Sequence, residues 1–311
     1  KIIRTKRRGG KISALFFTKK AFVEKQENSG TETTEKGILE KVVFSVVSDR
    51  KKNNAFKKHA IRMKRRKNMY KSFSMNLAGR TLTVDIGRVA KQANGAAFMH
   101  YGDTTLLCTA TASDKPREGI DFFPLSVEYE EKMYAVGKIP GGFNKREGKA
   151  SEHAILTSRV IDRPMRPLFP KDYRNDVTLN NMVMAVDPEC NPEVVAMIGS
   201  SIATCVSDIP FDGPCAATQI GMVNGEFVVN PSLAQKEISD LQLTVASTRE
   251  KVIMIEAGAN EIPEDKMIEA IFKAHEVNQE IIAFIDTIVA ECGKEKHTYE
   301  SCAVPEELFA A

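Results

Sequence analysis

The sequence has no tryptophan and no two cysteines at the close spacing of a zinc-binding or redox motif. Its six cysteines stand apart, and most lie in apolar stretches, so a zinc site is not indicated. We expect buried free thiols, which suit a reducing compartment such as the cytoplasm. These cysteines are Cys108, Cys190, Cys205, Cys215, Cys292 and Cys302.

Long apolar runs are also missing. None approaches the roughly 20 residues that a membrane-spanning helix needs. The apolar stretch 12–17 is shorter than the core of a signal peptide, which is about 7–15 residues long, and two lysines follow it. We therefore expect a cytoplasmic protein with no membrane segment and no export signal.

Several catalytic signatures are absent from the sequence. There is no GxSxG nucleophile elbow and no recognisable Ser-His-Asp order. His100, His153 and His275 are scattered and lack neighbouring metal-ligating residues, so we interpret each as structural. No metal site is predicted within this chain.

Charge is distributed unevenly along the chain. Residues 1–68 carry 21 Lys and Arg against six Asp and Glu, and the remainder has an acidic excess. Such a basic segment is typical of an arm that binds nucleic acid or an anionic membrane. The alternative is disordered or upstream flanking sequence. We favour the alternative because the chain does not begin with methionine, whereas Met69 opens a region of regular patterning.

Residues 69–260 alternate between strand-like and helix-like patterns, which indicates an α+β domain of mixed or antiparallel sheets packed with helices. Turn signals are Asn94-Gly95, Gly102-Asp103 and Asn224-Gly225. Expected strands are 81–86, 96–101, 104–111, 122–128, 177–186, 220–223, 226–229, 241–246 and 252–257. Expected helices are 151–162, stopped by Pro164, and 192–203.

Residues 261–311 read as the start of an all-α domain. Pro263 suits the first turn of a long helix, and Glu264 and Asp265 suit the positive end of its dipole. Apolar residues then recur every three or four positions, and Gly293 is a plausible end of the helix. The apolar stripe requires a packing partner.

A loop at residues 137–149 combines four basic residues with several glycines and Phe143. Glycines let a backbone approach phosphates, and a nucleobase stacked on an aromatic ring contributes about 1–3 kcal/mol. A P-loop is excluded, because the glycine spacing is wrong and Lys149 is followed by alanine. Single-stranded nucleic acid is one candidate ligand, and a mobile surface loop is the alternative.

A second basic segment follows the loop. Arg159 and Arg163 are four residues apart and share a helix face, and Arg166 lies just beyond. Three neighbouring arginines can hold successive phosphates. The alternative is ion pairing with Asp162, Asp172 or surface carboxylates.

These two segments resemble the polynucleotide phosphorylase family. The resemblance rests on residues 137–152 (GKIPGGFNKREGKASE) and 155–169 (ILTSRVIDRPMRPLF), with further matches at 122–129 and 187–190. It runs from about residue 69 to the C-terminus. It implies an RNase PH-like domain at 69–260 and a helical domain after it, within a homotrimer of subunits that each hold two RNase PH-like domains.

The resemblance also implies an activity and an RNA path. Enzymes of the family use inorganic phosphate, with Mg²⁺ or Mn²⁺, to release nucleoside diphosphates from the 3′ end of single-stranded RNA, and they act in mRNA degradation, with proteins of RNA-degradation complexes as possible partners. By this match Phe143, Lys145 and Arg146 contact RNA, and Arg159, Arg163 and Arg166 assist. Here Asn144 and Lys145 replace an aromatic residue and an arginine of the family pattern.

The resemblance places the catalytic residues in a second RNase PH-like domain, outside this chain. In the corresponding strand here, Gln242 stands where a metal-binding carboxylate is expected and Thr244 where a lysine is expected. This part is therefore expected to thread RNA and form the trimer without catalysis. Two alternatives remain open. One is an autonomous metal-dependent ribonuclease using Asp208 and Asp212, and the other is a non-enzymatic RNA-binding scaffold using the basic arm.

Overall fold

The structure is a computed structural model that describes residues 70–301. The basic segment 1–68, Met69 and Cys302 lie outside these residues. Strands β1–β4 are Lys71–Leu77, Arg80–Ile86, Gly95–Tyr101 and Thr104–Ala112, and β5 and β6 are Leu125–Glu131 and Val177–Ala185. Strands β7–β10 are Ala216–Val223, Glu226–Val229, Leu241–Ser247 and Val252–Ala259. Helices α3–α6 are Glu152–Met165, Pro192–Val206, Leu233–Glu237 and Glu264–Cys292.

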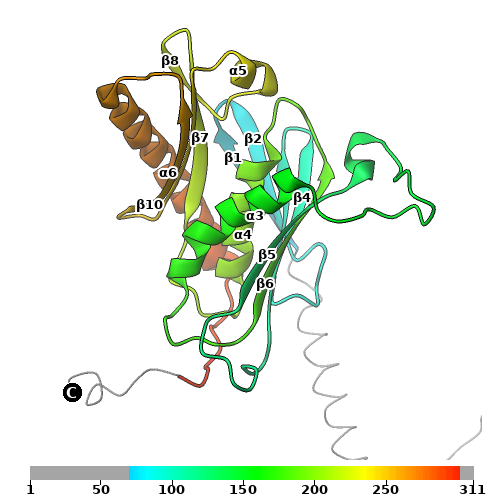
Figure 1. Ribbon diagram of the computed structural model, residues 1–311. Coiled ribbons are helices and arrows are strands. Elements are labelled where there is room, and N and C mark those ends of the chain that lie inside the picture. The colour runs from blue at the N-terminus through cyan, green and yellow to red at the C-terminus, as the bar shows by residue number, and fades with distance from the viewer. Residues whose placement is uncertain (1–69, 302–311) are drawn as a thin grey trace, which may run out of the picture. The chain divides into compact units, whose positions relative to one another are not determined.

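The strands form two sheets (Figure 1). The first has the order β1-β2-β3-β4-β6-β5, antiparallel except for the parallel pair β5 and β6. The second has the order β10-β9-β7-β8 and is antiparallel throughout. Its β7–β8 hairpin turns at Asn224-Gly225, where both residues have positive φ, as the sequence predicts.

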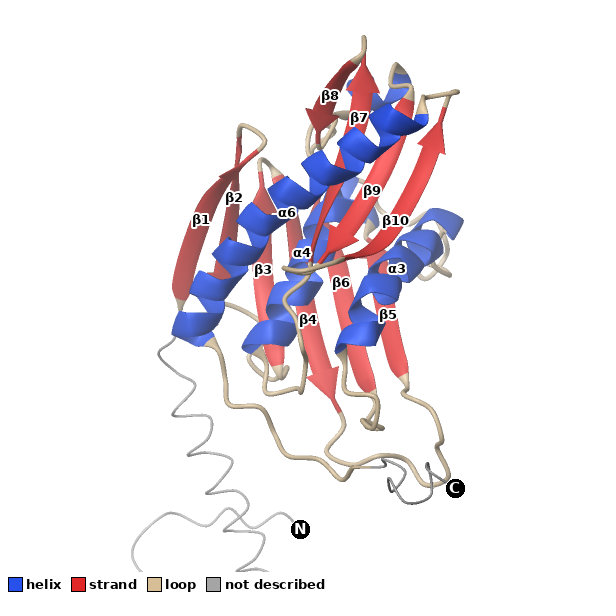
Figure 2. Cartoon of the chain, turned by 90° about the vertical axis from the view of Figure 1, so that its left-hand side faces the viewer, coloured by secondary structure: helices blue, strands red, loops and turns tan. Residues whose placement is uncertain are grey.

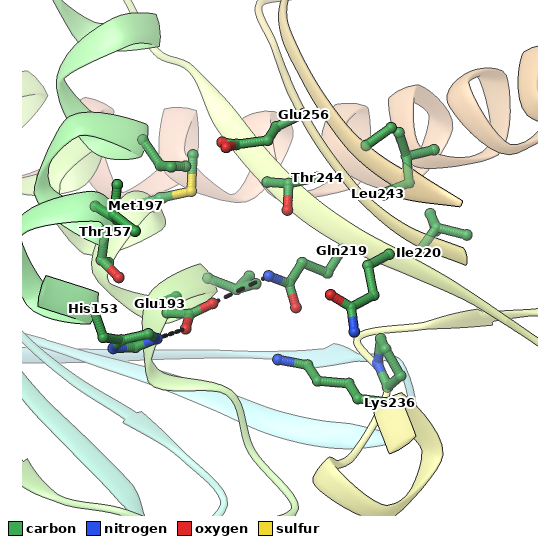
Figure 3. Close-up of a pocket in the computed structure, with 17 residues that line it drawn as sticks. His153, Thr157, Glu193, Met197, Gln219, Ile220, Lys236, Leu243, Thr244 and Glu256 are labelled. Atoms are coloured by element: carbon green, nitrogen blue, oxygen red, sulfur yellow. Dashed lines mark hydrogen bonds and ion pairs between the residues drawn. The ribbon is translucent and has the colours of Figure 1, made fainter. Parts of the chain in front are cut away.

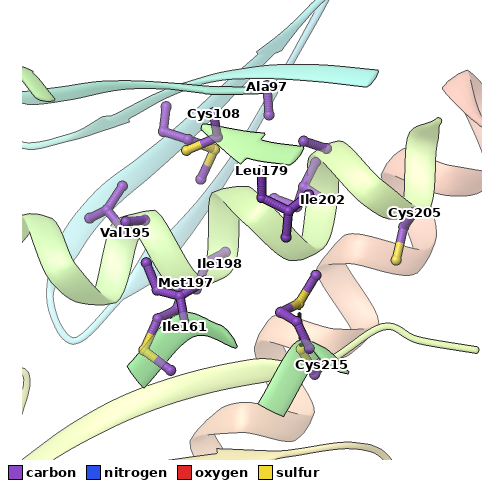
Figure 4. Packing of buried hydrophobic residues seen from close by; sticks show 14 of the residues in the cluster. Ala97, Cys108, Ile161, Leu179, Val195, Met197, Ile198, Ile202, Cys205 and Cys215 are labelled. Carbon is purple, nitrogen blue, oxygen red and sulfur yellow. Dashed lines mark hydrogen bonds between the residues drawn. The ribbon is translucent and has the colours of Figure 1, made fainter. Parts of the chain in front are cut away.

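Helix α4 lies between the two sheets and is almost wholly buried. Asn191 caps its N-terminus by accepting a hydrogen bond from the Glu193 amide, and Pro192 occupies the first turn. Thirteen of its fifteen residues are buried, because β3 and β4 pack on one side and β7 and α6 on the other. Cys108 of β4 lies against this helix (Figure 4). A Cβ on Gly199 would overlap Cys108 Sγ, so only glycine permits this approach.

Helix α6 crosses the second sheet and packs on β7 and β9 (Figure 2). Its inner face shares the apolar core with the sheets, through Ile281, Ile285 and Ile288. Within this face Asn278 is fully buried and bonds to both strands. The expected division of domains after residue 260 stays a prediction. Among the described helices, none is both long enough and apolar enough to span a membrane.

The first strand was missing from the sequence prediction. β1 is the edge strand of the large sheet, and its residues alternate between exposed and half-buried positions, which weakens the apolar signal. The start of β5 was also wrong by three residues. Pro124 precedes the strand, Phe122 is exposed, and Phe123 packs on the ring of Phe169 at 4.9 Å. The two phenylalanines therefore contribute to the loop and core rather than to the strand.

The expected helix end at Pro164 and the expected turn at Gly95 are both wrong. Pro164 does not stop α3, which runs to Met165 and continues into the short 3₁₀ turn Arg166–Leu168. Gly95 is not part of a hairpin turn, since it is the first residue of β3 and pairs with Ala110. It is glycine because a Cβ would overlap the Ala203 carbonyl oxygen of α4.

Two adjacent apolar residues of α3 face away from the core. Ile155 is 52% exposed and Leu156 59% exposed, whereas Thr157 faces inward. All five described cysteines are free and buried, which confirms the expected thiol state for these residues. Burial raises the pKa of the Cys215 thiol to about 12, so this thiol stays protonated and unreactive near neutral pH.

Candidate nucleic-acid interface

The basic loop connects the end of β5 to the start of α3 and projects away from both sheets (Figure 1). Its first part forms a 3₁₀ turn, Met133–Val136, which ends at Gly137 with positive φ. The remainder has no regular secondary structure, and it ends at Ser151, whose hydroxyl caps α3 by accepting from the Ala154 amide.

The glycines of this loop are not required by packing. A Cβ built on Gly141, Gly142 or Gly148 would meet no atom of the described chain within 4 Å. None of the three has positive φ. Their lack of side chains therefore leaves open backbone that a ligand can approach closely.

Phe143 and Lys145 lie at the exposed part of the loop. The Phe143 side chain is 101% exposed, so its ring contacts no core residue and both faces are open to a stacking partner. Lys145 has a φ of 50°, in a tight turn where its amide donates to the Gly142 carbonyl. Both residues are thus displayed to solvent.

Beneath the loop is a concavity of about 1200 Å³ formed by the end of β5, the loop and the first turns of α3. It brings Arg146 and Lys149 of the loop together with Arg159 of α3. None of these three cations forms an ion pair with another described residue. Three unpaired basic side chains around one hollow are suited to phosphate oxygens.

Carboxylates also line the concavity, but most are already engaged. Glu130 pairs with Lys132 at 2.5 Å. Glu131 accepts hydrogen bonds from Ser151 and His153. Glu147 accepts from the Met133 amide at 3.3 Å. Each of these three carboxylates is thus engaged by the loop or by the residues at its end.

The other two arginines have different partners. Arg166 forms a two-point ion pair with Asp162 and donates to the carbonyls of Phe123 and Leu125, each at 3.1 Å. Arg163 lies 3.8 Å from Glu256 of β10. Neither lines the concavity. Both arginines therefore form ion pairs in this structure, which was the alternative to phosphate binding. Their contact with RNA stays an untested prediction.

His153 has a more specific role than its isolated position in the sequence indicated. Its Nδ1 lies 2.9 Å from Glu131 and its Nε2 lies 2.7 Å from Glu193 of α4. Partial burial lowers its pKa, but the two carboxylates outweigh this and hold the pKa above its usual value. The three residues come from three separate elements, so residue spacing carried no signal of this contact.

A second cavity, of about 480 Å³, lies between α3, the start of α4 and the second sheet (Figure 3). Gln242 and Thr244, which stand where the family pattern has a carboxylate and a lysine, both line it. The donor set does not suit a divalent cation. Gln242 is neutral, and Glu193 is held by His153 and Gln219. Within residues 70–301, no three potential metal-ligating side chains converge.

Asp208 and Asp212 do not form a paired carboxylate site. Asp208 accepts a hydrogen bond from Asn94 at 2.8 Å. Burial raises its pKa, but this bond and nearby cations outweigh the effect and lower it. The Asp212 amide donates to the Leu168 carbonyl. Each residue thus holds a loop in place, Asp208 through its side chain and Asp212 through its backbone amide.

Two family models match consecutive parts of the chain. Residues 78–210 match "3′ exoribonuclease family, domain 1", and residues 213–277 match "3′ exoribonuclease family, domain 2". Together they cover more than half of the chain. Among solved structures, rice (Oryza sativa) Rrp46 superposes with a TM-score of 0.53 at 15% identity, over 66% of this chain and 93% of that one. This likeness confirms the RNase PH-like fold.

Curated relatives are much more similar in sequence. The polyribonucleotide nucleotidyltransferase of Lachnoclostridium phytofermentans is 81% identical over 243 residues, which are 78% of this chain and 35% of the relative. That of Ruminiclostridium cellulolyticum is 60% identical over 241 residues, 78% of this chain and 34% of the relative. The chain thus spans about a third of the length of these relatives. It belongs to the 3′ exoribonuclease family, on the polyribonucleotide nucleotidyltransferase branch.

Proposed function

We propose that this chain is the RNA-guiding part of a phosphate-dependent 3′-to-5′ exoribonuclease. The whole protein would release nucleoside diphosphates from RNA, with inorganic phosphate as co-substrate, and take part in mRNA degradation. The names of the close relatives support this reaction. The observation that carries the RNA role is the concavity lined by Arg146, Lys149 and Arg159, none of which is ion-paired within residues 70–301.

The chemistry of this surface suits single-stranded RNA. Phosphates bind to clustered cations, and the exposed Phe143 ring offers a face on which any base can stack. Recognition of this kind is largely independent of base sequence. A strand drawn over the loop toward an active site requires such tolerance, because every nucleotide of the RNA must pass the same contacts.

Catalysis is assigned to another part of the whole protein. Gln242 and Thr244 lack the charge needed to hold Mg²⁺ or Mn²⁺ and to stabilise a transferring phosphate, so this cavity is not suited to the catalytic step. The same proposal includes binding of Mg²⁺ or Mn²⁺ elsewhere in the complete enzyme and its assembly into a homotrimeric ring. Partner proteins of RNA degradation are included in the same proposal.

The RNA role is tested with Lys145→Ala combined with Arg146→Ala, measuring oligo(A) affinity between 50 and 200 mM salt, a range over which phosphate contacts lose affinity steeply. We expect a roughly tenfold weaker affinity and a salt slope smaller by about two. The matched control is Lys115→Ala with Lys171→Ala, which removes two exposed charges elsewhere. Unchanged affinity and slope in the loop variant would overturn the proposed RNA role.

The absence of catalysis is tested separately. The folded chain is incubated with poly(A), phosphate and magnesium, and released ADP is measured. We expect none. ADP release would mean that the chain holds a phosphorolytic site of its own, whereas phosphate-independent cleavage would favour an autonomous ribonuclease.

A further inference from the structure

Both ends of the basic loop are fastened to one carboxylate. Glu131 is the last residue of β5 and lies immediately before the loop. Ser151 and His153 lie where the loop ends and α3 begins. The Ser151 hydroxyl donates to Glu131 Oε2 at 2.8 Å, and His153 Nδ1 lies 2.9 Å from Glu131 Oε1. The two oxygens of one side chain therefore close the base of the loop.

The opposite side of the imidazole is fixed to the core. His153 Nε2 lies 2.7 Å from Glu193, at the start of α4 (Figure 3). Glu193 in turn accepts from Gln219 Nε2 at 3.2 Å and from Asn191 Nδ2 at 3.3 Å. Because α4 is buried between the sheets, this carboxylate provides a rigid anchor. The histidine thus links the loop to α4, the most completely buried of the described helices.

The geometry requires a particular protonation state. A neutral imidazole has one N–H donor and one acceptor nitrogen, whereas both nitrogens of His153 face carboxylate oxygens within 2.9 Å. Only the imidazolium can donate on both sides. Loss of the proton would leave a lone pair against a carboxylate and open one of the two contacts.

We propose that His153 is the positioning residue of the basic loop, and that as an imidazolium it closes the loop's base and holds its cations over the RNA-binding concavity. This inference rests on the proposed RNA role of that concavity. Two carboxylates contact the ring directly, Glu131 of β5 and Glu193 of α4. The other titratable groups of the neighbouring elements are Tyr129 of β5 and Glu152 of α3, together with Lys236 of α5 and Glu256 of β10, which line the same cavity as His153.

The acidic side chains predominate in this set, which is why the proton is retained. Lys236 is the one cation among these groups. Among the described residues, the ion pairs of the ring are with Glu131 and Glu193 alone. As the pH rises through the elevated pKa of His153, the proton leaves and the base of the loop opens. The cations of the loop are then held less closely above the concavity.

The first experiment measures the loop without RNA. Hydrogen exchange of residues 132–150 is compared at pH 6 and pH 8.5, after correction for intrinsic rates, in the wild type, His153→Ala and His275→Ala. In the wild type we expect protection at pH 6 that is lost at pH 8.5, by about threefold to tenfold in rate. His153→Ala should lack this protection at both pH values, and His275→Ala, on the distant helix α6, should match the wild type.

The second experiment measures oligo(A) affinity over the same pH range. The wild type should lose about threefold to tenfold more affinity than His153→Ala between pH 6 and pH 8.5. If His153→Ala does not fold, Glu131→Gln removes the carboxylate charge at the same contact with little change of shape. Identical pH profiles and loop exchange in wild type and variant would overturn the proposal. If loop exchange depends on His153 but the Lys145 and Arg146 variant binds RNA normally, the positioning role stands and the RNA role fails.

Discussion

Thr218 of β7 donates a hydrogen bond to the side-chain oxygen of Asn278 in α6, with 2.7 Å between the two oxygens, at a site where both side chains are fully buried. The Asn278 amide also donates to the Val245 carbonyl and to Ser247 Oγ of β9, each at 3.0 Å. One side chain therefore fixes the position of α6 on two strands, because any sliding of the helix would leave buried polar groups without partners.

We predict that Asn278→Ala lowers the free energy of unfolding by about 2–4 kcal/mol, since it leaves the buried hydroxyls of Thr218 and Ser247 without this partner. Urea denaturation of the variant and of Glu280→Ala, an exposed change on the same helix, measures this. The Glu280→Ala control should stay within about 0.5 kcal/mol of wild type. A similarly small change for Asn278→Ala would show that the network adds nothing to stability.

Gly95→Ala should destabilise the protein by about 1–3 kcal/mol, because the new methyl group would overlap the Ala203 carbonyl and crowd Ser207. Gly148→Ala is the matched change at a glycine with open space around it, and it should be neutral within about 0.5 kcal/mol. Thermal unfolding of both variants checks the difference. Equal midpoints would mean that α4 shifts to accommodate the methyl group.

Asp85 should contribute stability that depends on pH. Burial raises its pKa, but hydrogen bonds from Arg88 and Ser72 outweigh this, so the pKa lies below its ordinary value of 3.8. The carboxylate therefore adds stability that is fully present above pH 3.8 and is lost as the pH falls through the lowered pKa. Asp85→Asn should be less stable than wild type at pH 7 by about 1–2 kcal/mol, and this gap should narrow at more acidic pH.

Denaturation of Asp85→Asn and of Asp114→Asn, an exposed loop carboxylate, at a series of pH values tests the expectation. The control should run parallel to wild type. A gap for Asp85→Asn that is constant from pH 7 downward would mean that the Arg88 contact at 2.8 Å does not bias the titration of the carboxyl.

Single substitutions of Arg159 and Arg166 should differ in their effects on RNA binding and on stability. Arg159→Ala removes an unpaired cation of the concavity, so it should weaken oligo(A) binding and lower the salt slope by about one, with little effect on stability. Arg166→Ala removes the bonds to Asp162 and to two carbonyls, so it should cost about 1–2 kcal/mol of stability and leave the salt slope unchanged. The reverse pattern would mean that Arg166 turns toward RNA when the strand is bound.

Strand and helix positions with strong periodicity could be predicted from the sequence. The alternation at 81–86 predicts a strand and Asn224-Gly225 predicts a hairpin turn, and the structure contains both. The edge strand β1 and the register of β5 could not be predicted, because one is only half-buried and the other follows Pro124. Gly95 was misread as a turn because its role depends on α4, more than 90 residues later.

The candidate site was likewise only partly predictable from the sequence. The loop residues Phe143, Lys145 and Arg146 are exposed, as a local pattern of glycine and charge indicates. Which arginines remain unpaired depends on tertiary contacts. Arg166 is held by the backbone before β5, and no spacing along the chain distinguishes it from Arg159. The contact of His153 with Glu131 and Glu193 likewise exists only after three elements pack together.

The burial of α4 bears on how this fold can be divided. The two family models separate between residues 210 and 213, just after this helix ends. A polypeptide cleaved there would leave α4 on the first piece with the side facing β7 and α6 uncovered, and would leave the second sheet on the other piece without its support. Neither piece retains a closed core. The two halves should therefore melt in one cooperative transition, and if produced separately they should gain structure only when mixed.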